Sequence, residues 1–122
     1  MGIGLNHYRN LNSILMLSSE KDIQAVIEQY LRLLEQRKLL VYIKNNSGAL
    51  KTERGSFLRF GKAGSPDFLI FLSEGKTIHL EVKNHRGRQT ESQNQYQKQV
   101  ESLGHQYYVA RSLKELIEFL DF

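Results

Sequence analysis

The chain has 122 residues, of which 40% are apolar and 25% are charged, and this is the composition of one ordinary globular domain with a single core. Its longest apolar runs, such as 68–72, are far shorter than the ~20 residues that cross a bilayer, and its N-terminus lacks the basic and apolar regions of a secretory signal. Because the chain contains no cysteine, disulfides, thiolate zinc sites and cysteine nucleophiles are excluded, and we expect a cytoplasmic location.

The net charge is +4, from 17 basic and 13 acidic residues, and the excess is concentrated in one segment. Between positions 44 and 64 the only acidic residue is Glu53. A basic, polar, glycine-containing stretch suits contact with a phosphate backbone, although many solvated loops are also basic. The basic residues of this segment are Lys44, Lys51, Arg54, Arg59 and Lys62.

The first half of the chain predicts one helix and one strand before a long polar segment. Ser19 and the acidic residues after it are typical of a helix start, and apolar residues at helical spacing carry the helix to near Arg37. The short apolar run 39–43 predicts a strand that a turn at 45–48 closes. The polar segment then continues to Gly64, with a minor strand at 57–60, and a segment this long is usually functional or mobile.

The middle of the chain predicts two adjacent strands of different character. The run 68–72 is apolar at every position, which is expected of a central strand buried on both faces. After a tight turn at 73–76, apolar and polar residues alternate over 77–83, so this strand has one apolar and one polar face.

The last third of the chain predicts a helix, a strand and a helix. Thr90 and Gln93 fit a capping box for a helix that runs to about Leu103, where Gly104 stops it. A last strand at 106–110 precedes a final helix that Ser112 caps. The whole order indicates an α/β fold with a mixed central sheet flanked by helices.

Two carboxylates and a lysine should converge at one end of the two middle strands. The chain's one proline presents Asp67 at a rigid junction between loop and strand. Period-two geometry places Glu81 and Lys83 on the same side of the following strand. If the two strands form a hairpin, Asp67 lies beside Glu81, and carboxylates there can hold Mg²⁺ while the lysine orients or deprotonates an attacking water.

These residues resemble a known nuclease signature. Pro66-Asp67 followed by Glu81-Val82-Lys83 is similar to the motif of the PD-(D/E)xK nuclease superfamily. More closely, the segment 61–67, this motif, the helix cap at 90–93 and Gly104 resemble a stand-alone VRR-NUC domain, the virus-type replication-repair nuclease module of phages and prophages. The resemblance covers about residues 18 to 120. It implies a restriction-endonuclease-like αβββαβ core with an extra C-terminal helix, hence a single nuclease domain over 18–122 after an N-terminal segment, 1–17.

The resemblance also implies an activity and roles for named residues. The activity is a phosphodiesterase that depends on Mg²⁺ or Mn²⁺, with no organic cofactor. Asp67 and Glu81 would ligate the metal with the Val82 backbone carbonyl, and Lys83 would serve the attacking water. Gln93 would orient Lys83 or a phosphate, although a capping-box glutamine can also be purely structural.

The family pattern includes a glutamate on the first helix, and two residues compete for this role. Helical periodicity places Glu20 at the edge of the buried stripe and Glu28 toward solvent. We therefore expect Glu20 to assist metal or water positioning and Glu28 to be an ordinary surface charge. His79 shares the polar strand face, but because the lysine fills the role of base in the resembled family, we expect His79 to be a packing or solvated residue.

The expected function is structure-selective endonuclease activity on DNA, with branched DNA such as Holliday junctions as the substrate. Stand-alone members of the resembled group can act as dimers, and we expect a homodimer to which residues 1–17 contribute. Two other functions stay open: a catalytically silent nucleic-acid-binding module, and a restriction-type or RNA-directed nuclease. Besides the basic residues of 44–64, the expected phosphate contacts are Arg86 and Arg88.

Overall fold

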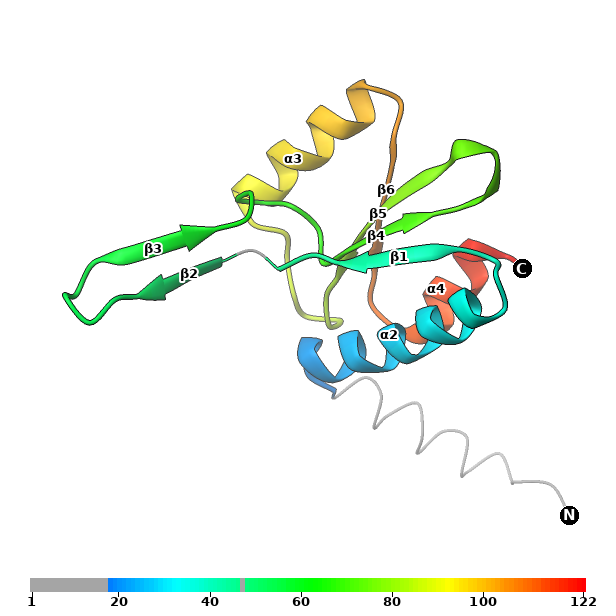
Figure 1. Ribbon diagram of the computed structural model, residues 1–122, viewed down its shortest axis with the longest axis horizontal. Helices are drawn as coiled ribbons and strands as arrows, with labels where there is room; N and C mark the ends of the chain where they lie inside the picture. The colour runs from blue at the N-terminus through cyan, green and yellow to red at the C-terminus, as the bar shows by residue number, and fades with distance from the viewer. Residues whose placement is uncertain (1–17, 47) are drawn as a thin grey trace, which may run out of the picture.

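The computed structural model describes residues 18–46 and 48–122 (Figure 1). A four-stranded sheet has the order β1-β4-β5-β6, in which β4 is antiparallel to β1 and β5, and β5 is parallel to β6. This mixed sheet with flanking helices confirms the predicted α/β fold. The elements are α2 (Glu20–Gln36), β1 (Val41–Lys44), β2 (Gly48–Lys51), β3 (Phe57–Phe60), β4 (Phe68–Phe71), β5 (Thr77–Val82), α3 (Glu91–Ser102), β6 (Gln106–Ala110) and α4 (Leu113–Leu120).

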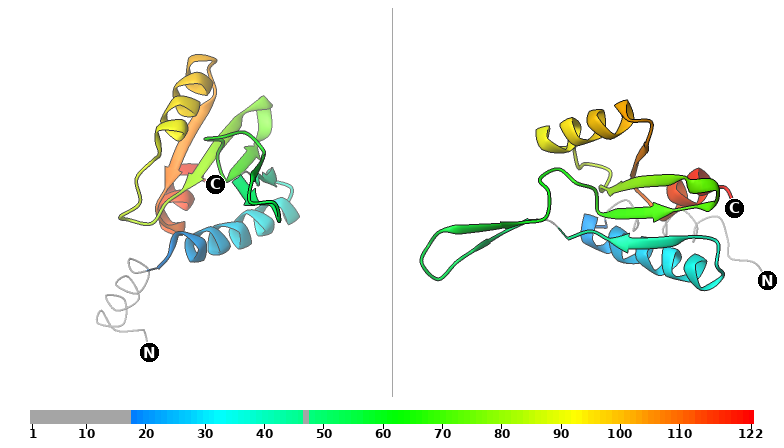
Figure 2. Two further views of the ribbon diagram at one scale, coloured as in Figure 1. Left: turned by 90° about the vertical axis from the view of Figure 1, so that its left-hand side faces the viewer. Right: turned by 45° about the horizontal axis from the view of Figure 1, so that its top comes forward.

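The apolar face of the sheet packs against α2 and α4, and the core lies between them (Figures 1 and 2). Ile27 and Leu31 of α2 are fully buried, as is Leu116 of α4. From the sheet, β5 contributes its three alternating apolar residues, Ile78, Leu80 and Val82. The strand's period of two therefore sends its other side chains to the opposite face.

The opposite face of β5 is polar and is nevertheless buried, because side chains of α3 contact it and the turn at Gly87 packs against Lys83. His79, Glu81 and Lys83 are only 8%, 2% and 7% exposed. The predicted division of this strand into an apolar and a polar face is correct, but the sequence pattern did not reveal that both faces are covered. Burying polar groups is costly unless they find partners, so this face is where a functional site is expected.

The helix starts follow the predicted caps. Ser19 Oγ accepts a hydrogen bond from Asp22 N at 3.1 Å at the start of α2. Thr90 and Gln93 form a complete capping box at the start of α3, with both reciprocal hydrogen bonds present. Within the described part of the chain, no helix is both long and apolar enough to span a membrane.

Three local predictions differ from the structure. The first strand covers Val41–Lys44 instead of 39–43, because Leu40 turns into the core before pairing with β4 begins. Strand β4 is central but not buried on both faces, since Phe71 is 38% exposed. The polar segment is not an irregular loop: β2 pairs antiparallel with β3 as a hairpin that begins at Gly48, where a turn was expected.

The predicted N-terminal segment, 1–17, lies outside the described residues.

Candidate metal centre and active site

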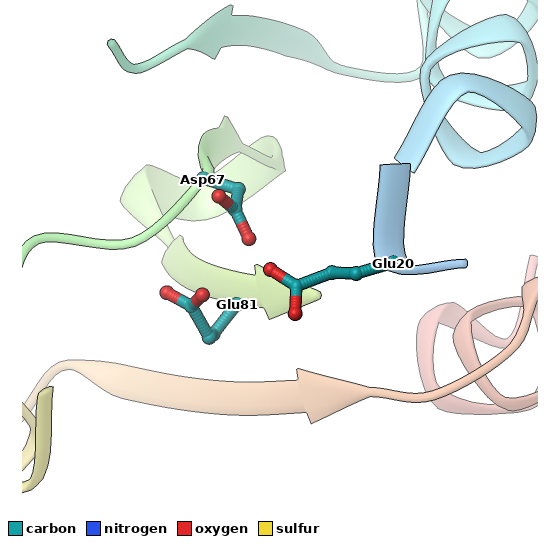
Figure 3. Close-up of side chains that lie close together, drawn as sticks. All are labelled: Glu20, Asp67 and Glu81. Carbon is teal, nitrogen blue, oxygen red and sulfur yellow. The ribbon is translucent and has the colours of Figure 1, made fainter. Parts of the chain in front are cut away.

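Three carboxylates from three separate elements meet at one end of β5 (Figure 3). Glu20 comes from the first turn of α2, Asp67 from the junction before β4, and Glu81 from β5. One oxygen of each lies within 4.8 Å of the others. Converging carboxylate oxygens are the ligands that Mg²⁺ and Mn²⁺ prefer.

Asp67 is held in place from two sides. Its Oδ2 accepts a hydrogen bond from Val82 N at 2.7 Å, and its backbone carbonyl accepts one from Asn45 N at 2.8 Å. Asn45 also donates through its side-chain amide to the Pro66 carbonyl at 2.8 Å. Because Phe68 pairs with Leu80 in the register of β4 and β5, Asp67 lies beside Glu81. Strands β4 and β5 therefore pair as the sequence predicted, with Asp67 beside Glu81.

Glu81 is the most deeply buried of the three carboxylates. Its Oε1 accepts a hydrogen bond from Gln93 Nε2 at 3.2 Å, whereas Oε2 is buried and has no hydrogen-bond partner among the described residues. Burial, followed by the neighbouring Asp67 carboxylate, raises its pKa from 4.5 to about 9. An orphaned buried oxygen among crowded carboxylates fits a divalent cation, whose charge would satisfy the oxygen and offset the repulsion.

Lys83 stands between two of these carboxylates. Its Nζ lies 3.9 Å from Glu81 Oε1 and 4.0 Å from Glu20 Oε2. Its stem is packed so closely under Gly87 that a methyl group there would lie 3.3 Å from Lys83 Cδ. The ammonium is thus confined beside the carboxylate cluster rather than free to swing into solvent.

The two competing glutamates of α2 have separate environments. Glu20 joins the cluster, whereas Glu28 accepts a hydrogen bond from Tyr42 Oη at 3.4 Å and pairs with Lys44 Nζ at 3.7 Å. Two turns of helix separate them, so only the residue at the N-terminal end reaches the end of β5. Lys44, one of the expected phosphate contacts, is thereby engaged by a carboxylate.

Gln93 and His79 have structural partners on the buried polar face. The Gln93 amide group contacts Glu81 and the Thr90 backbone N–H, so it orients the Glu81 carboxylate, and its expected role toward Lys83 or a phosphate stays a prediction. His79 Nδ1 lies 2.8 Å from Tyr96 Oη, and burial lowers its pKa. This packing against α3 agrees with the expected role of His79.

The remaining basic residues lie on loops and on the hairpin. Arg86 and Arg88 are exposed in the loop after Lys83. Lys62, Lys51 and Arg54 are exposed in the segment between β1 and β4. The side chain of Arg59 lies outside the described residues, as does any contact it makes.

Sequence reasoning missed two residues that support the site. Asn45 holds the chain before Asp67, as described above, and was assigned only to a turn. Arg111 donates through Nη1 to the carbonyl oxygens of Asn84 at 2.6 Å and Gly87 at 2.7 Å, and so holds the turn that covers Lys83. No local sequence signal could identify Arg111, because its partners lie more than 20 positions earlier in the chain.

Comparison with known proteins places the fold. No family model matches the sequence, and no curated protein matches it. A solved structure described as a VRR_NUC domain superposes with a TM-score of 0.60 at 19% identity, covering 85% of this chain and 97% of that one. At this identity the likeness speaks for the backbone arrangement alone. The chain therefore has the fold of a VRR_NUC domain, as its motifs predicted.

Proposed function

We propose that this chain is a divalent-metal-dependent endonuclease of the VRR-NUC type, which hydrolyses phosphodiester bonds in branched DNA such as Holliday junctions. The observation that carries the proposal is the cluster of Glu20, Asp67 and Glu81 with Lys83 beside it. The orphaned Glu81 Oε2 supports metal binding independently of any motif. Residues 18–122 would form the nuclease domain.

In this proposal each residue of the cluster has a defined task. Asp67 and Glu81 would hold Mg²⁺ or Mn²⁺ with the Val82 carbonyl, and Glu20 would be a further ligand. The bound ion would supply Lewis-acid chemistry at the phosphoryl group. Lys83 orients the attacking water and stabilises negative charge on the phosphate oxygens. Gln93 fixes the Glu81 carboxylate through its amide, as the 3.2 Å hydrogen bond indicates.

The basic residues around the cluster would bind the DNA backbone. Lys62, Arg86 and Arg88 are exposed on segments that adjoin Asp67 and Lys83 in the chain, and Lys51, Arg54 and Arg59 belong to the hairpin between them. We also propose a homodimer that uses residues 1–17, because two-fold symmetry would supply two sites for paired nicks. Light scattering of the full chain tests this, and a monomer across micromolar concentrations would contradict it.

A cleavage assay tests the activity. The full chain is incubated with Mg²⁺ or Mn²⁺ and labelled four-way junction, flap, linear duplex or single-stranded DNA, beside Lys83→Ala. We expect cleavage of the branched substrates, its loss with EDTA, and a loss of at least about 100-fold in Lys83→Ala with binding retained. Lys76→Ala is the matched control, because Lys76 is an exposed lysine that pairs with Glu74 in the turn between β4 and β5.

The outcomes separate the possible functions. Substrates that are bound in Ca²⁺ but never cut in Mg²⁺ or Mn²⁺ would identify a catalytically silent binding module. Cleavage that Lys83→Ala retains in full would refute the mechanism proposed for this cluster.

A further inference from the structure

The hairpin of β2 and β3 is a built element that stands away from the rest of the protein (Figures 1 and 2). Its tip is closed by hydrogen bonds from Thr52 N to the Ser56 carbonyl at 2.7 Å and from Gly55 N to the Thr52 carbonyl at 2.9 Å. Gly55 has a φ of 83°, a conformation that favours glycine. The tip therefore has a defined shape, which presents Arg54 to solvent.

Each face of this hairpin carries at least one exposed apolar side chain. Leu50 and Leu58 are directly paired, so they share one face, and they are 61% and 59% exposed. Phe57 is paired with Lys51 on the other face and is 72% exposed. An isolated two-stranded hairpin is only marginally stable in water, and exposed apolar groups of this size mark a contact surface. A partner that contacts both Phe57 and the Leu50–Leu58 pair therefore has to reach both faces of the hairpin.

The charge of the hairpin and its attachment indicate what this partner is. Exposed Lys51 and Arg54 outnumber Glu53, which favours an anionic partner. The base of the hairpin is joined to the carboxylate cluster, because Asn45 bonds to the Asp67 carbonyl on one side. On the other side Gly64 lies against the backbone of Ser92 at the start of α3. The base of the hairpin is thus fixed next to the proposed site of cleavage, and its tip extends away from the domain (Figure 1).

We propose that this hairpin is a wedge that enters the branch point of branched DNA, where Phe57 and the Leu50–Leu58 pair stack on the end base pairs of two neighbouring arms. Apolar side chains inserted between base steps, and aromatic rings stacked on bases, are established modes of nucleic-acid contact. Lys51 and Arg54 then lie near the phosphates of the separated strands. The inference deepens the proposed function and rests on it for the choice of substrate.

Two other occupants fit the observations less well. The groove of a linear duplex admits a two-stranded ribbon but presents bases to only one of its faces, which would leave the other apolar face exposed. A second hairpin from another copy of the chain would bring Lys51 and Arg54 against like charges. Two arms of a branch cover both apolar faces and neutralise both cations.

The wedge is tested with the full chain in Ca²⁺ and a synthetic four-way DNA junction that carries 2-aminopurine beside the branch point. We expect binding to change the fluorescence, and Phe57→Ala to abolish this change and to weaken junction binding about tenfold. Affinity for linear duplex should be unchanged. The control is Phe122→Ala, which removes a phenylalanine that is 60% exposed at the C-terminal end.

A variant with a shortened hairpin provides a second, independent test. Because Ala49 and Arg59 are directly paired, an Asn-Gly turn can replace residues 50–58 and still join the two strands. We expect this variant to keep the cooperative unfolding and the metal-dependent phosphodiesterase activity, and to lose its preference for the junction over linear duplex.

The possible failures are distinguishable. If Phe57→Ala weakens junction and linear duplex equally, the hairpin is a general DNA contact and not a wedge. If the shortened variant changes from dimer to monomer in sedimentation and the fluorescence change persists, the hairpin is an interface between copies. If no DNA is cut by the wild-type chain but the fluorescence results hold, the proposed activity fails while the wedge stands.

Discussion

The polar face of β5 and the β2–β3 hairpin place their functional groups in opposite ways. On β5, each side chain is held by a different element: Glu81 by α3 through Gln93, and Lys83 beside Glu20 of α2. In the hairpin, the hydrogen bonds that define the tip lie within the hairpin itself. The geometry of the proposed metal site therefore depends on tertiary packing. The surface proposed to contact DNA depends mainly on the local sequence of the hairpin and on its attachment to the domain.

The two regions also differ in electrostatics. The carboxylates are crowded and partly or fully buried, and the pKa of Glu81 is raised first by burial and then by the weakly screened repulsion from Asp67. The hairpin charges are exposed and are screened by salt. Substitutions in the cluster should therefore have large effects on activity and stability, and substitutions of hairpin charges should act mainly on DNA binding and its salt dependence.

The largest expected effect is on cleavage, when substitutions of the two glutamates of α2 are compared. Glu20→Gln removes a charge from the cluster and one of the two carboxylate partners of Lys83, so we expect cleavage to fall at least about 100-fold. Glu28→Gln is the matched control, because Glu28 contacts Tyr42 and Lys44 instead. Single-turnover cleavage of a labelled junction measures both variants. Equal activity in the two would remove Glu20 from the proposed site.

The joint between the two regions is tested at Gly64. Gly64 and Gly75 both have positive φ, at 80° and 72°, but a methyl group on Gly64 would collide with the Ser92 carbonyl, whereas on Gly75 it meets nothing. Gly75→Ala should cost about 1 kcal/mol of unfolding free energy, and Gly64→Ala about 2–4 kcal/mol. Urea denaturation compares them. Equal losses would show that the loop before Asp67 is not braced by α3.

A further effect is a pH dependence of stability that belongs to the buried face alone. The pKa of Glu81 is raised from 4.5 to about 9, so between these values the unfolded chain releases a proton that the folded chain retains. The metal-free protein should therefore lose stability as pH rises through this interval, and none of this loss occurs below the unfolded pKa.

Glu81→Gln is the comparison that isolates this effect. Glutamine stays neutral, so the stability advantage of Glu81→Gln over wild type should grow steadily from about pH 5 to about pH 9 in EDTA. Urea denaturation at several pH values measures the difference between the two proteins. Adding Mn²⁺ should reverse the stability advantage of Glu81→Gln over wild type, since the cation stabilises the ionised carboxylate. A difference that does not change with pH would contradict the raised pKa.

Much of the fold could be predicted from local patterns. The helix caps at Ser19 and Thr90 and the alternation along β5 are short-range signals, and the structure has a helix or strand at each. The hairpin of β2 and β3 was predicted only as a polar segment with one minor strand. Its strands are short, and Leu50 and Phe57 do not alternate against a buried face, so the usual strand signal is absent.

The sequence alone indicated that Asp67, Glu81 and Lys83 converge, because Pro66-Asp67 and Glu81-Val82-Lys83 belong to neighbouring strands and their junctions, and the turn between the strands sets their register. Helical periodicity favoured Glu20 over Glu28, but the contact of Glu20 with Asp67 and Glu81, and that of Gln93 with Glu81, could be seen only in the tertiary structure. Such contacts depend on where α2 and α3 pack against the sheet. That packing is set by the burial of apolar surface over the whole domain, which no local pattern encodes.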